Sequence, residues 1–219
     1  MTRREPISLF SSDARGARRP RRRVRRVLVA SCLVWSMAWS MSCNELVTDG
    51  NSSSVLVIEL LDGSPGLTDS FGGSLASDVQ TDGGVTSDLG RVSARLALKD
   101  PGTSANPATP TSANWITVTR YRVEYIRGDG RNTPGVDVPY PIDGGVSFTV
   151  IDLISQQFVL VRAQAKLEPP LRALKGLGGA VLIATVARVT FYGHDQTGAD
   201  VRATANISVT FADWADPES

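Results

Sequence analysis

The chain of 219 residues has one histidine, two cysteines and few aromatic residues, and these scarcities exclude several kinds of site. One histidine and the single cysteine that follows the apolar segment, Cys43, are too few for the three or four ligands of a usual zinc site. A Ser-His-Asp triad would have to use His194, which lies beside a turn with Asp195 on the opposite strand face. We therefore predict no catalytic residue, no metal, no cofactor and no enzymatic activity.

Acidic residues are scarce at the start of the chain and plentiful afterwards. Of 23 basic and 22 acidic residues, ten arginines and two acids lie in residues 1–42, which leaves 13 basic and 20 acidic residues beyond. Phosphate contacts need clustered lysine and arginine, so the acidic remainder predicts no nucleic-acid binding by the domain. The arginine run 15–26 is typical of the basic region of an export signal, and the alternative is a nucleic-acid-binding arm.

No uncharged apolar run is long enough to cross a membrane comfortably. The longest candidate, residues 27–41, has 15 residues, whereas a spanning helix needs about 20. Its length suits the apolar core of a signal peptide, and an uncleaved anchor is the alternative. We predict that residues 1–42 form a signal peptide.

The join "SMSC" (40–43) places a small residue, Ser42, directly before Cys43. It resembles the processing site of bacterial lipoproteins, although Ser40 stands where that family usually has an aliphatic residue. The resemblance implies cleavage before Cys43, lipidation of its thiol and a membrane partner. Residues 43–54 would then be a flexible tether, and the one remaining cysteine could form no internal disulfide. The alternatives are ordinary signal cleavage nearby and a free thiol.

Beyond residue 54 the apolar residues alternate with a period of two, which predicts strands rather than helices. In "VRATANISVTF" (201–211), for example, every second residue is apolar. Ile116 and Val118 are out of phase with Tyr121, which predicts a bulge near Thr119. The expected strands are 55–61, 91–99, 116–125, 146–153, 158–167, 181–192 and 201–211.

These patterns predict an all-β domain, an antiparallel β-sandwich of about seven strands over residues 55–213 with a tail at 214–219. The stretch 194–201 is a hairpin signal, with Gly198 able to adopt positive φ in the turn. Residues 62–90 are rich in Gly, Ser and Asp and predict a disordered or loosely draped loop. Residues 100–114, rich in Pro, Thr and Ala, predict a stiff exposed connector.

Two longer stretches carry a resemblance to known proteins. "TFYGHDQTGADVRATANISVTF" (190–211) resembles the closing hairpin of Ig-like domains in bacterial surface and periplasmic proteins. "YRVEYIRGDGRNTPGVDVPYPIDGGVSFTV" (121–150) is similar to stretches of uncharacterised bacterial lipoproteins. The resemblance implies an exported Ig-like β-sandwich without the cysteine pair of antibody domains. Fold does not specify function, so it implies no activity.

Two weaker candidates for binding chemistry remain. Asp129, Asn132, Asp137 and Asp143 could offer oxygens to calcium, but their spacing matches no EF-hand and suits turn formation. Trp115 and Trp214 could stack on a sugar or cover the edge of the core.

Taken together, these features lead us to expect a non-enzymatic, membrane-anchored lipoprotein of the bacterial cell envelope with a binding or structural Ig-like module. Its expected partners are the membrane, through Cys43, and envelope proteins or glycans. The alternatives are a carbohydrate-binding module and, less favoured, an envelope hydrolase that would depend on His194.

Overall fold

The computed structural model describes residues 52–66, 68–81 and 84–214. The chain divides into two units, Met1–Cys43 and Asn44–Ser219, and the described residues all belong to the second. The predicted signal peptide, Cys43, most of the tether and most of the tail lie outside the described residues. Within the described ranges, no helix is both long and apolar enough to cross a membrane.

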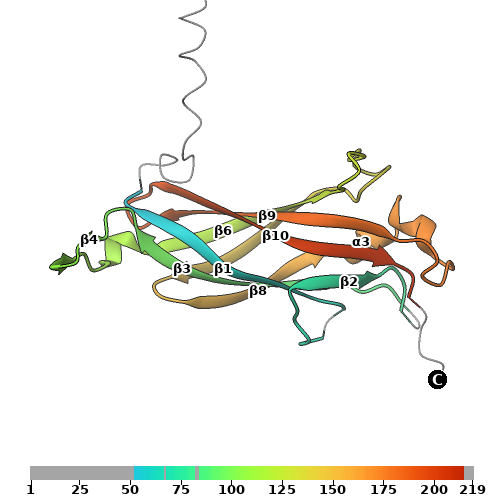
Figure 1. Cartoon of the computed structure of the whole chain (residues 1–219), viewed down its shortest axis with the longest axis horizontal. Coiled ribbons are helices and arrows are strands. Elements are labelled where there is room, and N and C mark those ends of the chain that lie inside the picture. Colours follow the sequence, from blue (N-terminus) through green and yellow to red (C-terminus); the bar gives the residue numbers. More distant parts are fainter. Residues whose placement is uncertain (1–51, 67, 82–83, 215–219) are drawn as a thin grey trace, which may run out of the picture. The chain divides into compact units, whose positions relative to one another are not determined.

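The described residues fold mainly into strands, as the alternation predicted (Figure 1). The strands are β1 (Ser54–Ser64), β2 (Ser74–Asp78), β3 (Asp88–Leu98), β4 (Gly102–Thr103), β5 (Asn106–Pro107), β6 (Ile116–Ile126), β7 (Ile142–Val150), β8 (Ile154–Val161), β9 (Ile183–Asp195) and β10 (Asp200–Ala212). Short helical turns are η2 (Ser112–Asn114), α3 (Ala163–Lys166) and η3 (Leu171–Leu174). Each of the seven expected strands has a counterpart, and β2, β4 and β5 are additional.

Apart from β4 and β5, which pair only with each other, the described strands form two sheets that pack together. One has the order β1-β3-β8 and the other the order β2-β10-β9-β6-β7. Apolar side chains from both sheets meet in one core, and aromatic rings link the layers: Phe158 of β8 packs edge-on against Tyr121 of β6 and Phe191 of β9. The Tyr125 hydroxyl donates a 2.7 Å hydrogen bond across the layers to the Leu160 carbonyl. Packing and such bonds hold the sheets together.

Two local predictions are confirmed. The register of β6 shifts between Val118 and Arg120 against both of its neighbours, which is the bulge expected near Thr119. Strands β9 and β10 pair as an antiparallel hairpin through a turn in which Gly198 has φ of 88°. Strand β9 is the middle strand of its sheet, with one face buried in the core and the other exposed at Ala184, Val186 and Arg188.

The prediction that residues 62–90 form a loop is wrong. This segment contains β2, which pairs in parallel with β10 from Ser208 to Ala212. It also contains the end of β1 and the start of β3. Leu75 and Ser77 are buried, so β2 is part of the sheet and not a loose connection. A five-residue strand within a Gly- and Ser-rich segment has too little alternation to stand out, and its partner lies far away in sequence.

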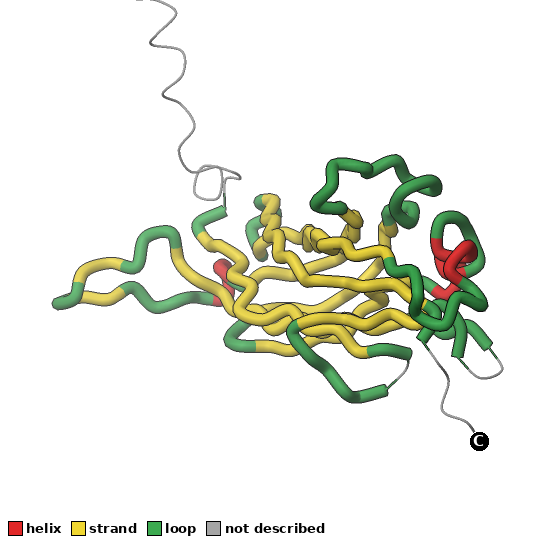
Figure 2. Tube along the Cα trace, turned by 45° about the vertical axis from the view of Figure 1, so that its right-hand side comes forward, coloured by secondary structure: helices red, strands yellow, loops and turns green. Residues whose placement is uncertain are grey.

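Residues 100–114 are exposed up to Ala113, in agreement with the predicted connector. They form the small β4–β5 hairpin and the η2 turn. Figure 2 shows this hairpin extending from one end of the packed sheets, with the α3 turn at the opposite end. Strand β7 begins and ends a few residues before the range expected for it, 146–153.

The strand predicted at 158–167 is wrong in both length and phase. Strand β8 ends at Val161, and Ala163–Lys166 form a helical turn. Phe158, Leu160 and Val161 are buried, whereas strict alternation from Val159 to Leu167 would place Val159 and Val161 together on the inner face and Leu160 outside. Because the segment from Phe158 to Val161 is continuously apolar, its phase was not determined by the pattern.

A buried ion pair stabilises the end of the domain where α3 lies. Lys166, which lies within the predicted strand 158–167, is 3 % exposed and places its Nζ 2.9 Å from Oδ1 of the fully buried Asp88. The same carboxylate accepts hydrogen bonds from the Ser77 hydroxyl (2.6 Å) and the Gly66 amide (2.8 Å). The network therefore ties α3, β2 and the segment after β1 to the start of β3.

A candidate ligand site on the five-stranded sheet

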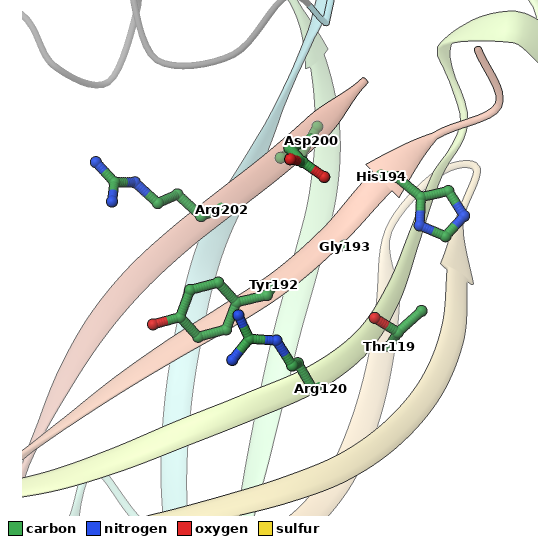
Figure 3. A pocket seen from close by; sticks show the side chains of 8 residues that line it. Thr119, Arg120, Tyr192, Gly193, His194, Asp200 and Arg202 are labelled. Carbon is green, nitrogen blue, oxygen red and sulfur yellow. The ribbon is translucent and has the colours of Figure 1, made fainter. Parts of the chain in front are cut away.

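Three side chains on neighbouring strands form a row on the outer face of the five-stranded sheet. Arg120 of β6 is the register partner of Tyr192 of β9, and Tyr192 is the register partner of Arg202 of β10. Both arginines are exposed and the tyrosine is half-buried. The aromatic ring therefore stands between two basic residues (Figure 3).

A hollow of about 380 Å³ opens around this row. It is lined by Thr119, Arg120, Tyr192, Gly193, His194, Asp200, Val201 and Arg202. The bulge at Thr119 breaks the regular ladder here, and bulges often occur beside functional sites. Gly193 lies opposite the bulge, where a Cβ atom would overlap the Thr117 carbonyl and the Val118 backbone. A glycine at 193 thus allows β6 to approach β9 closely at the hollow.

Stacking orients one of the two arginines. The guanidinium carbon of Arg120 lies 3.8 Å from the centre of the Tyr192 ring, a cation–π contact. Its sheet neighbour Arg122 instead bonds to the carboxylates of Glu124 and Asp143. Within the described part of the chain Arg120 forms no such ion pair, so its N–H donors are held in place without a carboxylate partner.

His194, the one histidine of the chain, lines the hollow but is not arranged as a catalytic base. It is half-buried on the outer face, and its register partner is Asp200. Among the described residues, no hydrogen bond joins those two side chains, and neither serine nor cysteine lines the hollow. The geometry provides neither an oriented base nor a nucleophile of the triad type.

Asp195 lies on the other face of the strand, as expected, and organises the hairpin turn. It is 1 % exposed, and its Oδ1 accepts hydrogen bonds from the Thr197 amide and hydroxyl and from the Ala199 amide. Burial acts to raise the pKa of Asp195, but the polar groups of Thr197, Ser52 and Ala199 outweigh it and bring the pKa down to about 2. The residue therefore supports the turn from which His194 and Asp200 emerge.

The four side chains considered for calcium have separate protein partners. These are Arg127 and Arg131 for Asp129, the Arg127 amide for Asn132, the Thr133 amide for Asp137, and Arg122 for Asp143. No group of three or more His, Cys, Asp or Glu residues in the described ranges is placed to hold a metal ion. This arrangement agrees with the interpretation of these residues as turn formers.

The two tryptophans considered for sugar stacking do not line the hollow. Trp115 is half-buried beside η2, and Trp214 follows β10 with 37 % of its surface exposed. The aromatic residue at the hollow is Tyr192, which sequence reasoning did not select. Its pairing with Arg202 follows from the predicted hairpin, whereas the approach of Arg120 depends on how β6 pairs with β9.

Comparisons of the chain with protein-family models, curated proteins and solved structures found no match. The hollow, the row of three side chains and the sequence around Cys43 are therefore the basis for assigning a function.

Proposed function

We propose that the protein is an exported lipoprotein of the bacterial cell envelope, anchored through Cys43, whose domain is a non-enzymatic binding or structural module. The observation that carries the proposal is the order of segments: arginines, an apolar stretch, the SMSC join and then a polar stretch. Ten residues separate Cys43 from Ser54, the first residue of β1. They could reach at most about 40 Å, which would keep the domain near the membrane surface.

The domain itself is proposed to be Ig-like. Immunoglobulin-type domains place strands A, B and E in one sheet and C, F and G in the other. If β1, β3, β6, β7, β8, β9 and β10 are read as A, B, C, C′, E, F and G, the two sheets have the orders A-B-E and G-F-C-C′. Strand β2 would be an extra strand added in parallel to G. This agreement of strand order supports the proposal more strongly than the number of strands does.

The outer face of the five-stranded sheet is the proposed binding surface. It carries the hollow, the stacked Arg120–Tyr192 pair, and His194 and Asp200 at the ends of β9 and β10. The hollow brings several polar side chains together around one aromatic ring, an arrangement that suits a small polar ligand. A carbohydrate-binding module is the second candidate, favoured by the position of Tyr192 within the hollow.

The first experiment is an intact-mass measurement of the mature N-terminus from the membrane fraction of an expressing bacterium. A diacyl or triacyl mass on Cys43 that is absent from a Cys43→Ala variant is the expected result. An unmodified N-terminus near residue 43 would indicate a secreted protein without a lipid anchor. An intact N-terminus that still carries the arginines would overturn the export proposal and favour the basic-arm alternative.

A further inference from the structure

We infer that the hollow beside Tyr192 binds an acidic saccharide, a sugar ring that carries a carboxylate. The inference rests on the proposal that this sheet face is the binding surface, and it is independent of lipidation at Cys43. Three features carry it: the charge of the hollow, the aromatic ring at its centre and the polar groups around the ring.

The charge of the hollow favours an anionic group. Its lining includes two arginines, Arg120 and Arg202, and one acid, Asp200. This basic site occurs on a chain whose residues beyond 42 include 13 basic and 20 acidic side chains. Arginine presents a planar fork of donors that matches a carboxylate. Because stacking on Tyr192 already orients the Arg120 guanidinium, little conformational entropy would be lost when it binds an anion.

The aromatic ring favours an anion that is part of a larger ring compound. Tyr192 lines the hollow between the two arginines in register, with its side chain half-buried. Its ring offers apolar surface and its hydroxyl offers a polar end. A free inorganic anion would make no use of the aromatic surface, whereas the C–H face of a sugar would pack against it. The volume of about 380 Å³ lies within the usual range of small-molecule sites, about 300–1,000 Å³.

The remaining polar groups suit sugar hydroxyls. The Asp200 carboxylate accepts hydrogen bonds, the Thr119 hydroxyl can donate or accept, and His194 adds ring nitrogens. Figure 3 shows His194 and Asp200 farther along the strands than the Arg120–Tyr192 pair. A carboxylate near the arginines and hydroxyls near Asp200 would therefore occupy different parts of the hollow. A neutral sugar would leave the stacked Arg120 donors without an anion.

The test is a calorimetric titration of the purified full chain in neutral detergent, with digalacturonate as the probe. The corresponding neutral digalactoside and inorganic phosphate are titrated in parallel. We expect digalacturonate to bind at least tenfold more tightly than either probe. The neutral sugar cannot form charge-assisted bonds with Arg120, and phosphate has no apolar face to pack on Tyr192. Arg120→Ala and Tyr192→Ala should each weaken binding at least tenfold.

Arg188→Ala is the matched control. Arg188 is exposed on the same face of β9 but does not line the hollow, so binding should be unchanged. A circular dichroism melt of each variant shows whether it is folded. Equal affinity for the neutral sugar would overturn the assignment to an acidic ligand. Phosphate binding as tight as that of digalacturonate, unaffected by Tyr192→Ala, would overturn the sugar part.

An absence of binding by all three probes at millimolar concentration would overturn the inference as a whole. The lipid mass on Cys43 distinguishes this failure from that of the proposed function. If the thiol is acylated and no saccharide binds, the proposal of a lipid-anchored module is supported and its partner belongs to another chemical class. If saccharide binds and the thiol is unmodified, the assignment of the ligand is supported and the proposal of a lipid anchor is overturned.

Discussion

The buried pair of Lys166 and Asp88 allows a quantitative test of how the domain is held together. In Lys166→Met the side chain keeps its length and apolar character but loses its charge, which leaves the Asp88 carboxylate buried without a cation. Breaking one side of a buried ion pair costs about 3–5 kcal/mol. Asp88 keeps its hydrogen bonds from Ser77 and Gly66, so the lower end, about 3 kcal/mol, is expected.

This loss should be visible in urea unfolding followed by far-ultraviolet circular dichroism. For a domain of this size about 3 kcal/mol corresponds to a fall in Tm of about 6–12 °C. The matched control is Arg95→Met, which breaks the ion pair with Glu59. Those two side chains are 47 % and 42 % exposed, so the free energy of unfolding should fall by less than about 1 kcal/mol.

A double variant separates the electrostatic effect from packing. Lys166→Met combined with Asp88→Asn removes both charges and retains an amide that can bond to Ser77 and Gly66. It should recover much of the stability lost in Lys166→Met, because no uncompensated charge is left in the core. If Lys166→Met costs no more than Arg95→Met, Asp88 is not held in a dry site. If the double variant recovers nothing, the uncompensated charge of Asp88 is not the cause of the loss.

Two further predictions concern β7 and the β9–β10 turn. Gly144→Ala should lower the free energy of unfolding by about 1–3 kcal/mol, because the new Cβ would overlap the buried Tyr121 ring. In the control Gly145→Ala the new Cβ meets no atom within 4 Å, so the free energy of unfolding should change by less than about 0.5 kcal/mol. Equal effects of the two variants in urea unfolding would contradict the close contact between Gly144 and Tyr121. The pKa of Asp195 is held at about 2, below its usual 3.8, so its stabilising contribution is complete above about pH 4 and is lost as pH falls toward 2. Acid titration of Asp195→Asn should therefore show a smaller loss of stability in that interval than the unchanged chain, and identical curves would refute the assignment.

Local patterns were sufficient for most strands and for part of the candidate site. The alternation in 201–211 places Arg202 outward, and the Gly198 turn sets the register that brings Arg202 beside Tyr192. The phase change before Tyr121 located the bulge that borders the hollow. These features depend on residues close together in the chain, so covalent geometry and the period of the strand determine them.

Other features depend on contacts between distant segments. Strand β2 exists because β10 provides a parallel partner, and the burial of Lys166 depends on Asp88, 78 residues earlier in the chain. A lysine within a short alternating run predicts an exposed face, since a buried charge is stable only when the fold provides its counter-ion. The hollow arises in the same way, because Arg120 reaches Tyr192 only after β6 has paired with β9. The sequence by itself determined the all-β class and the closing hairpin, whereas the tertiary structure decided which polar side chains are buried and which converge on one site.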